Sequence, residues 1–147
     1  MSELPLSQAL IGTWRLLSRE DVTASGERRI DPGLGADPLA LLVYDRAGNF
    51  AAQFMKRDRQ AAPAAAAAAP NNSRAVGGYD AYFGSYTVDD AAGTVTQRLV
   101  GALSAENVGL VLTRSMQVRG DELVIRLDTA SADGTPVLRT LRWRRAA

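Results

Sequence analysis

The chain has 147 residues, of which 46% are hydrophobic and 22% are charged, proportions that are ordinary for one soluble globular domain. Its 17 Lys and Arg residues nearly balance 16 Asp and Glu residues, and the resulting net charge of +1 argues against a nucleic-acid partner. The sequence has no cysteine and no histidine, which excludes disulfides, thiol catalysis and imidazole chemistry, so we expect no metal site and no cofactor.

The N-terminal residues, 1–10, contain no basic stretch followed by an apolar stretch. No apolar run in the chain approaches the length of a membrane span. We therefore expect no signal peptide, no membrane partner and a cytoplasmic location. Ser7 is expected to cap a short helix that leads into Leu10. Lys56 is the only lysine and alanine is abundant, which is typical of a GC-rich bacterial gene.

Apolar and polar residues alternate in short runs from residue 11 onward, a pattern that predicts half-buried β-strands. The first run places Trp14, Leu16 and Ser18 on one face. The predicted strands span residues 11–22, 28–30, 39–44, 49–55, 83–88, 94–103, 108–118, 122–129 and 137–145. Polar turns that contain Gly join several neighbouring runs into hairpins. This succession predicts an all-β fold, either an antiparallel up-and-down barrel or a sandwich.

One segment interrupts the strand pattern. Residues 61–72 are rich in Ala and Pro, and we interpret them as a low-complexity surface insertion within one domain that spans residues 1–147. After this segment, Ser73 is expected to cap a short helix that covers the barrel and precedes Tyr82. Two glycines weaken this helix by roughly 1 kcal/mol each.

Short motifs occur in order along nearly the whole chain. They are residues 10–16 (LIGTWRL), 37–38, 42–44, 78–82, 84–86, 93–96, 108–109, 114, 120–121, 123 and 141–143. In this order they resemble the bacterial lipocalin-like domain family, a calycin-type branch of small β-barrels. The resemblance implies a single antiparallel up-and-down barrel of about eight to ten strands, wide enough for one small ligand.

The same resemblance implies two local features. Trp14 plugs the bottom of the barrel, and Arg142 or Arg144 from the last strand packs over its indole in a cation–π contact. Gln97 and Arg98 stand where relatives often carry histidines, so family chemistry that needs imidazole is not expected here.

Arg114 is the first candidate site residue. It alternates with Leu112 and Met116 on its strand, so its guanidinium is expected to point into the apolar interior. A buried charge must be paired or bound to something. If it points inward, Arg114 either binds a carboxylate, phenolate or enolate of a ligand or forms a structural ion pair. The third alternative is a different strand register, in which Arg114 points outward.

Aromatic and polar residues near the predicted helix form a second candidate group. Helical spacing puts Tyr79 and Tyr82 on one side, and with Tyr86 they form either a lid over the barrel mouth or part of the core. Asp80 either acts as a general base, if burial raises its pKa, or faces water.

Two further polar residues lie on apolar strands. Gln97 alternates with Val95 and Leu99, so it either points inward to orient a ligand or lies at a solvated edge. Tyr44 ends a strand that is otherwise apolar.

These observations favour a carrier or sensor that binds a small, mostly apolar, anionic molecule in the barrel. The candidate ligand-binding residues are Arg114, Tyr79, Tyr82, Tyr86, Tyr44, Gln97, Leu112 and Met116. The alternative is a cofactor-free cyclase, isomerase or lyase that acts on an apolar molecule in the same cavity. A third reading is an interaction protein with a filled core. The sequence leaves open whether the chain is an enzyme, and a homodimer through an exposed strand edge also stays open.

Overall fold

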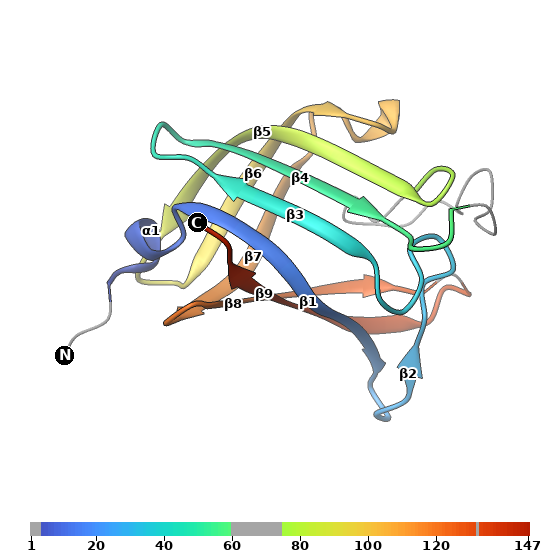
Figure 1. Ribbon diagram of the computed structural model, residues 1–147. Helices are drawn as coiled ribbons and strands as arrows, with labels where there is room; N and C mark the ends of the chain where they lie inside the picture. Colours follow the sequence, from blue (N-terminus) through green and yellow to red (C-terminus); the bar gives the residue numbers. More distant parts are fainter. Residues whose placement is uncertain (1–3, 60–74, 132) are drawn as a thin grey trace.

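The structure is a computed structural model that describes residues 4–59, 75–131 and 133–147, and most of its elements are strands (Figure 1). In chain order the elements are α1 (Leu6–Ala9), β1 (Gly12–Thr23), β2 (Arg28–Arg29), β3 (Leu39–Tyr44), β4 (Asn49–Met55), β5 (Tyr79–Asp89), β6 (Thr94–Ala102), the 3-10 turn η1 (Ala105–Asn107), β7 (Val111–Arg119), β8 (Glu122–Ala130) and β9 (Pro136–Arg145).

The strands form a closed barrel. From β3 to β9 each strand pairs in an antiparallel manner with the next strand along the chain. Strand β1 pairs with both β3 and β9, which closes eight strands into a ring, while β2 adds to β1 as an extra strand. The predicted all-β, up-and-down barrel is confirmed.

Alternate residues of each strand point into the barrel, because successive side chains of a strand lie on opposite faces. On β4, Phe50, Ala52 and Phe54 are buried, whereas Asn49 and Gln53 are exposed. Buried apolar side chains from seven of the eight ring strands form one hydrophobic cluster, and partly buried side chains of β5, such as Tyr82 and Tyr86, pack against it. This cluster surrounds the space in which a ligand-binding site would lie.

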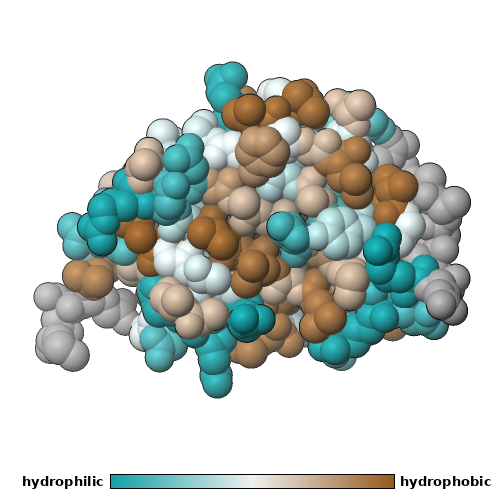
Figure 2. Space-filling view, turned by 45° about the horizontal axis from the view of Figure 1, so that its top comes forward, coloured by the Kyte–Doolittle hydropathy of each residue, from teal (hydrophilic) through white to brown (hydrophobic). Residues whose placement is uncertain are grey.

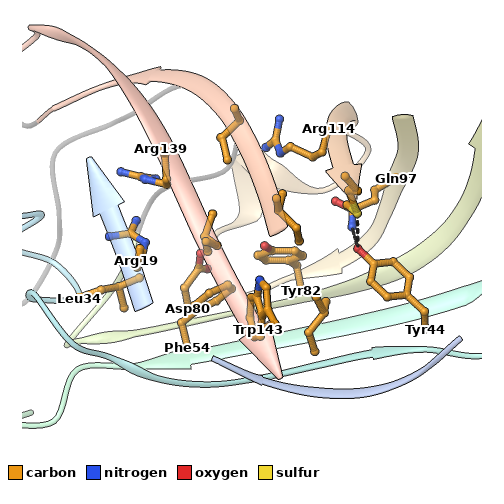
Figure 3. Close-up of a pocket in the computed structure, with 15 residues that line it drawn as sticks. Arg19, Leu34, Tyr44, Phe54, Asp80, Tyr82, Gln97, Arg114, Arg139 and Trp143 are labelled. Atoms are coloured by element: carbon orange, nitrogen blue, oxygen red, sulfur yellow. Dashed lines mark hydrogen bonds between the residues drawn. The ribbon is translucent and has the colours of Figure 1, made fainter. Parts of the chain in front are cut away.

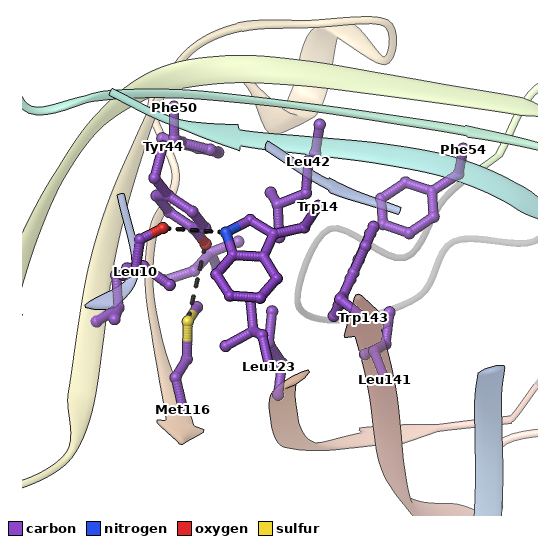
Figure 4. Packing of buried hydrophobic residues seen from close by; sticks show 14 of the residues in the cluster. Leu10, Trp14, Leu42, Tyr44, Phe50, Phe54, Met116, Leu123, Leu141 and Trp143 are labelled. Atoms are coloured by element: carbon purple, nitrogen blue, oxygen red, sulfur yellow. Dashed lines mark hydrogen bonds between the residues drawn. The ribbon is translucent and has the colours of Figure 1, made fainter. Parts of the chain in front are cut away.

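The bottom of the barrel is closed by Trp14 (Figure 4). Its indole is fully buried, and its N–H donates a hydrogen bond of 3.0 Å to the carbonyl of Leu10. The guanidinium of Arg145 lies 4.3 Å from the centre of the indole. Gly12, with a φ of 143°, makes room for the chain end, because a Cβ there would lie 2.6 Å from the carbonyl oxygen of Ala147. The predicted plug is therefore confirmed.

Arg145 makes the cation–π contact with Trp14. The prediction that Arg142 or Arg144 makes this contact is wrong. The register pairs Trp14 with Arg145 across β1 and β9. On β9 the buried positions are odd-numbered, as at Trp143, so the two even-numbered arginines point outward. Arg142 instead forms an exposed ion pair with Glu122.

The predicted helix ahead of Tyr82 is also wrong. Residues 79–82 begin strand β5, and Val76 and Tyr79 are joined by hydrogen bonds across a turn. Gly77 and Gly78 make this turn with φ values of 59° and 77°, which are left-handed and incompatible with a right-handed helix. Within residues 75–82, therefore, no helix covers the barrel.

The short N-terminal helix is confirmed, but Ser7 does not cap it. Pro5 occupies the N-cap position, and the amide and hydroxyl of Ser7 both donate to the carboxylate of Asp90. The predicted surface insertion at residues 61–72 lies outside the described residues. Among the helices of the described residues, none has both the length and the apolarity to cross a membrane.

The outer surface carries apolar side chains between its polar ones (Figure 2). Phe83 and Val100 are more than half exposed, and they line a shallow groove over β4, β5 and β6. No feature of the described residues identifies what would cover this groove. The homodimer therefore stays a prediction.

Candidate functional site

The inner side chains leave a cavity of about 60 Å³ inside the barrel (Figure 3). One water molecule needs roughly 10–15 Å³ of such space, so the cavity has room for a few waters. A cavity of roughly 150 Å³ admits benzene, so a ligand with an aromatic ring would need the lining side chains to move apart. Its apolar and aromatic lining consists of Leu34, Leu42, Phe54, Tyr82, Met116, Ile125, Leu127, Leu141 and Trp143. Its polar and charged lining consists of Arg19, Tyr44, Asp80, Gln97, Arg114 and Arg139.

Arg114 projects from β7 into this cavity, and only 8% of its surface is exposed. Leu112 and Met116, two positions away on either side, are buried on the same face, which confirms the predicted inward orientation. Burial lowers the pKa of Arg114, while the nearby phenol groups of Tyr82 and Tyr44 raise it. The side chain still carries its charge at neutral pH, because a guanidinium is not deprotonated in proteins.

Tyr44 and Gln97 form a fixed polar wall beside Arg114. The amide nitrogen of Gln97 donates a hydrogen bond of 2.6 Å to the hydroxyl of Tyr44, which donates in turn to the sulfur of Met116. Burial raises the pKa of Tyr44 far above its usual range, so the phenol stays neutral. Gln97 points inward and is buried, which settles its two alternatives in favour of the interior.

Asp80 lies on the inner face of β5 with 3% of its surface exposed, so the alternative that faces water is wrong. Burial raises the pKa of this carboxyl to about 7, although the amide of Ala81 and the charge of Arg19 act in the opposite direction. Within the described residues, its Oδ1 atom has no hydrogen-bond partner. The cavity therefore contains a carboxyl group that is partly protonated near neutral pH.

Two buried ion pairs lie near Asp80. Arg139 on β9 binds Asp21 on β1 through two hydrogen bonds of 2.8 and 2.9 Å. Arg19 on β1 binds Asp31 at 3.1 Å. Burial lowers the pKa of Arg19, and the neighbouring Arg139 lowers it further, while the two aspartates raise it. The pairs hold two guanidinium groups at the cavity wall.

Sequence reasoning missed both pairs, for different reasons. On β9, Arg139 alternates with buried Val137 and Leu141, the same signal that identified Arg114. On β1 the alternation is broken, because a bulge between Leu16 and Ser18 shifts the register. Ser18 is exposed, so the prediction that it shares the face of Trp14 is wrong, and Arg19 and Asp21 turn inward instead.

The structure brings five of the predicted site residues together around the cavity. These are Arg114, Tyr44, Tyr82, Gln97 and Met116. Leu112 is buried on the same inner face but does not line the cavity.

The predicted cluster of tyrosines does not form a lid. Strand alternation turns Tyr82 and Tyr86 inward and Tyr79 and Phe83 outward. Tyr86 packs edge-on against Tyr44 and lies outside the cavity lining, and its hydroxyl donates to the carbonyl of Asp45. The hydroxyl of Tyr79 donates to Gln53 on the outer surface.

The lining sets the chemistry that the cavity can perform. A guanidinium at Arg114 and the phenols of Tyr44 and Tyr82 can receive an anion. The carboxyl of Asp80 can accept a hydrogen bond or a proton. Within residues 4–59, 75–131 and 133–147, no group of three His, Cys, Asp or Glu residues is arranged to hold a metal ion.

A family model described as a lipocalin-like domain matches residues 11–146, which include every strand of the barrel. No curated protein matches the chain. The family match thus agrees with the architecture and leaves the ligand to be inferred from the cavity.

Proposed function

The chain belongs to the lipocalin-like domain family, and on this premise we propose that its barrel binds one small, mostly apolar, anionic molecule as a carrier or sensor. The observation that carries the proposal is the guanidinium of Arg114 at an interior cavity whose lining is mainly apolar. An eight-stranded barrel of this kind has an interior suited to one small ligand.

The charge of the lining favours an anion. Three guanidinium groups line the cavity, those of Arg19, Arg114 and Arg139. The first and the last form ion pairs with Asp31 and Asp21, so the preference for an anion rests on Arg114. The only acidic side chain of the described lining is Asp80, and burial raises the pKa of that carboxyl to about 7. Arginine binds a carboxylate through two parallel hydrogen bonds, which makes Arg114 suited to hold a carboxylate of the ligand.

The aromatic side chains of the wall favour a flat apolar body. The ring of Phe54 lies 5.7 Å from Trp143 and 6.3 Å from Tyr82, measured between ring centres. Aromatic rings pack well against other rings in offset or edge-on geometry. A small aromatic carboxylate therefore combines the two properties that the cavity selects, and benzoate is the simplest probe of this class.

Replacing Arg114 with Leu should weaken benzoate binding about 10- to 100-fold, the range expected for loss of a charged hydrogen bond. Isothermal titration of the intact protein and the variant gives both dissociation constants. Benzyl alcohol, which has no charge, should bind both proteins alike. Thermal unfolding of Arg114→Leu checks that the variant is folded.

Arg126→Leu is the matched control, because Arg126 is an exposed arginine on the neighbouring strand β8. Its substitution should leave benzoate binding unchanged. Equal affinity of benzoate for the parent protein and folded Arg114→Leu would contradict the role of Arg114.

A further inference from the structure

We propose that Asp80 and Trp143 form a second polar subsite in the cavity, which recognises a hydroxyl group on the apolar body of the ligand. This inference rests on the proposed function, in which the anionic group of the same ligand lies at Arg114. The ligand class is then a small hydroxylated aromatic acid.

Two buried polar atoms of opposite character line the cavity near each other. Oδ1 of Asp80 is a hydrogen-bond acceptor and Nε1 of Trp143 is a donor, and neither has a partner within the described residues. Buried polar side-chain atoms nearly always have a hydrogen-bond partner, so two such atoms at one cavity point to a molecule that enters it. The other tryptophan supplies a contrast, because the indole N–H of Trp14 donates to the carbonyl of Leu10.

Phe54 places the two residues in the same part of the cavity. Asp80 is the cross-strand partner of Phe54 where β4 pairs with β5. The indole of Trp143 packs edge-on against the Phe54 ring, with 5.7 Å between ring centres. Figure 3 shows Asp80, Phe54 and Trp143 close together, while Arg114 lies farther along the cavity beyond Tyr82. A ligand held at Arg114 thus extends toward both atoms.

A hydroxyl group fits this pair better than other polar groups do. It donates one hydrogen bond and accepts others, so it can donate to Asp80 and accept from Trp143 at once. A ketone or ether oxygen only accepts, and it would leave the carboxyl oxygen unsatisfied. An ammonium group only donates, and the guanidinium of Arg19, which is close enough to lower the pKa of Asp80, would repel it.

A matched series of carboxylates tests the subsite. Benzoate, 3-hydroxybenzoate, 4-hydroxybenzoate and the two corresponding methoxybenzoates are titrated calorimetrically into the full-length protein at pH 8. At least one hydroxybenzoate should bind about tenfold more tightly than benzoate, as expected for a hydrogen bond to a charged acceptor. Its methoxy analogue should show no such gain, because it has no proton to donate.

Asp80→Asn should reduce this preference for the hydroxyl, measured as the ratio of the benzoate and hydroxybenzoate dissociation constants of the same protein, to about threefold or less. The variant keeps the shape of the side chain and removes its charge. Asp89→Asn is the control, since Asp89 is an exposed aspartate at the end of the same strand. It should keep the full preference.

The indole N–H signals in a nitrogen–proton NMR spectrum give a second readout, which needs no variant of Asp80. The chain has two tryptophans, and Trp143→Phe, whose folding is checked by its spectrum, identifies the two signals. The hydroxybenzoate should shift the Trp143 N–H proton downfield relative to benzoate, which has no oxygen on its ring to accept this hydrogen bond. The Trp14 N–H, already bonded to Leu10, should stay in place.

The outcomes separate this inference from the function on which it rests. If benzoate and the hydroxybenzoates bind equally and all depend on Arg114, the binding function stands and the hydroxyl subsite is overturned. A hydroxyl preference that persists in Asp80→Asn, with no change in the Trp143 signal, overturns the subsite as well. If no carboxylate of the series binds, both proposals fall.

Discussion

Replacing Asp21 with Leu should lower the free energy of unfolding by about 3–5 kcal/mol, the cost typical of removing one partner from a buried ion pair. The carboxylate of Asp21 receives two hydrogen bonds from Arg139, and the side chains of both residues are about 95% buried or more. The substitution leaves the guanidinium in the barrel without this carboxylate. Because many domains have only 5–15 kcal/mol of stability, urea unfolding should show the loss clearly.

Two comparisons isolate the buried pair. The double variant Asp21→Leu with Arg139→Leu should recover much of the lost stability, since it removes the buried charges together. Glu122→Leu breaks the ion pair with Arg142, which joins β8 and β9 at the surface, and should cost only about 0–1 kcal/mol. A cost for Asp21→Leu as small as that for Glu122→Leu would show that the buried pair does not stabilise the barrel.

The architecture was predictable because most strands keep the alternation of apolar and polar residues and end in Gly-containing turns. The strands at residues 39–44 and 49–55 were predicted to the residue, and the polar turn between them fixes their register. Residues 79–82 were not predictable in the same way. Tyr79 and Tyr82 are three positions apart, which also suits a helix. The helix is excluded by the left-handed conformation of the glycines before them and by the pairing of these residues with β4.

The candidate site was predictable only where alternation is unbroken. Arg114 and Gln97 lie on regular strands, so their neighbours two positions away show that they point inward. The bulge in β1 reverses the faces after Leu16, and no local signal in the sequence marks it. The inward orientation of Arg19 and Asp21 was therefore not predicted, and neither was the ion-paired wall of the cavity to which they belong. Among the residues that the structure describes, the indole N–H of Trp143 has no hydrogen-bond partner. This results from tertiary packing, and no pattern in the sequence indicates it.

Ionisation of the buried Asp80 carboxyl should lower the free energy of unfolding of the parent protein as the pH rises. Burial raises the pKa of this carboxyl from 3.8 to about 7. Below about pH 4 the group is protonated in both states and contributes nothing. Between about pH 4 and pH 7 the folded state keeps a proton that the unfolded state has released, so stability falls, and above pH 7 the loss is constant. Each pKa unit corresponds to about 1.4 kcal/mol, which limits the total loss to about 4 kcal/mol.

Asp80→Asn should remove this loss, because the amide has nearly the same shape and does not ionise. We expect the variant to exceed the parent in free energy of unfolding by about 2–4 kcal/mol at pH 8, and by much less at pH 4. Urea unfolding of both proteins at a series of pH values measures the difference. Other carboxyls, such as Asp45 with its lowered pKa, change the stability of both proteins equally and cancel. A difference that does not vary between pH 4 and pH 8 would mean that the Asp80 carboxyl titrates alike in the folded and unfolded chain. Burial in the barrel would then not raise the pKa of this carboxyl.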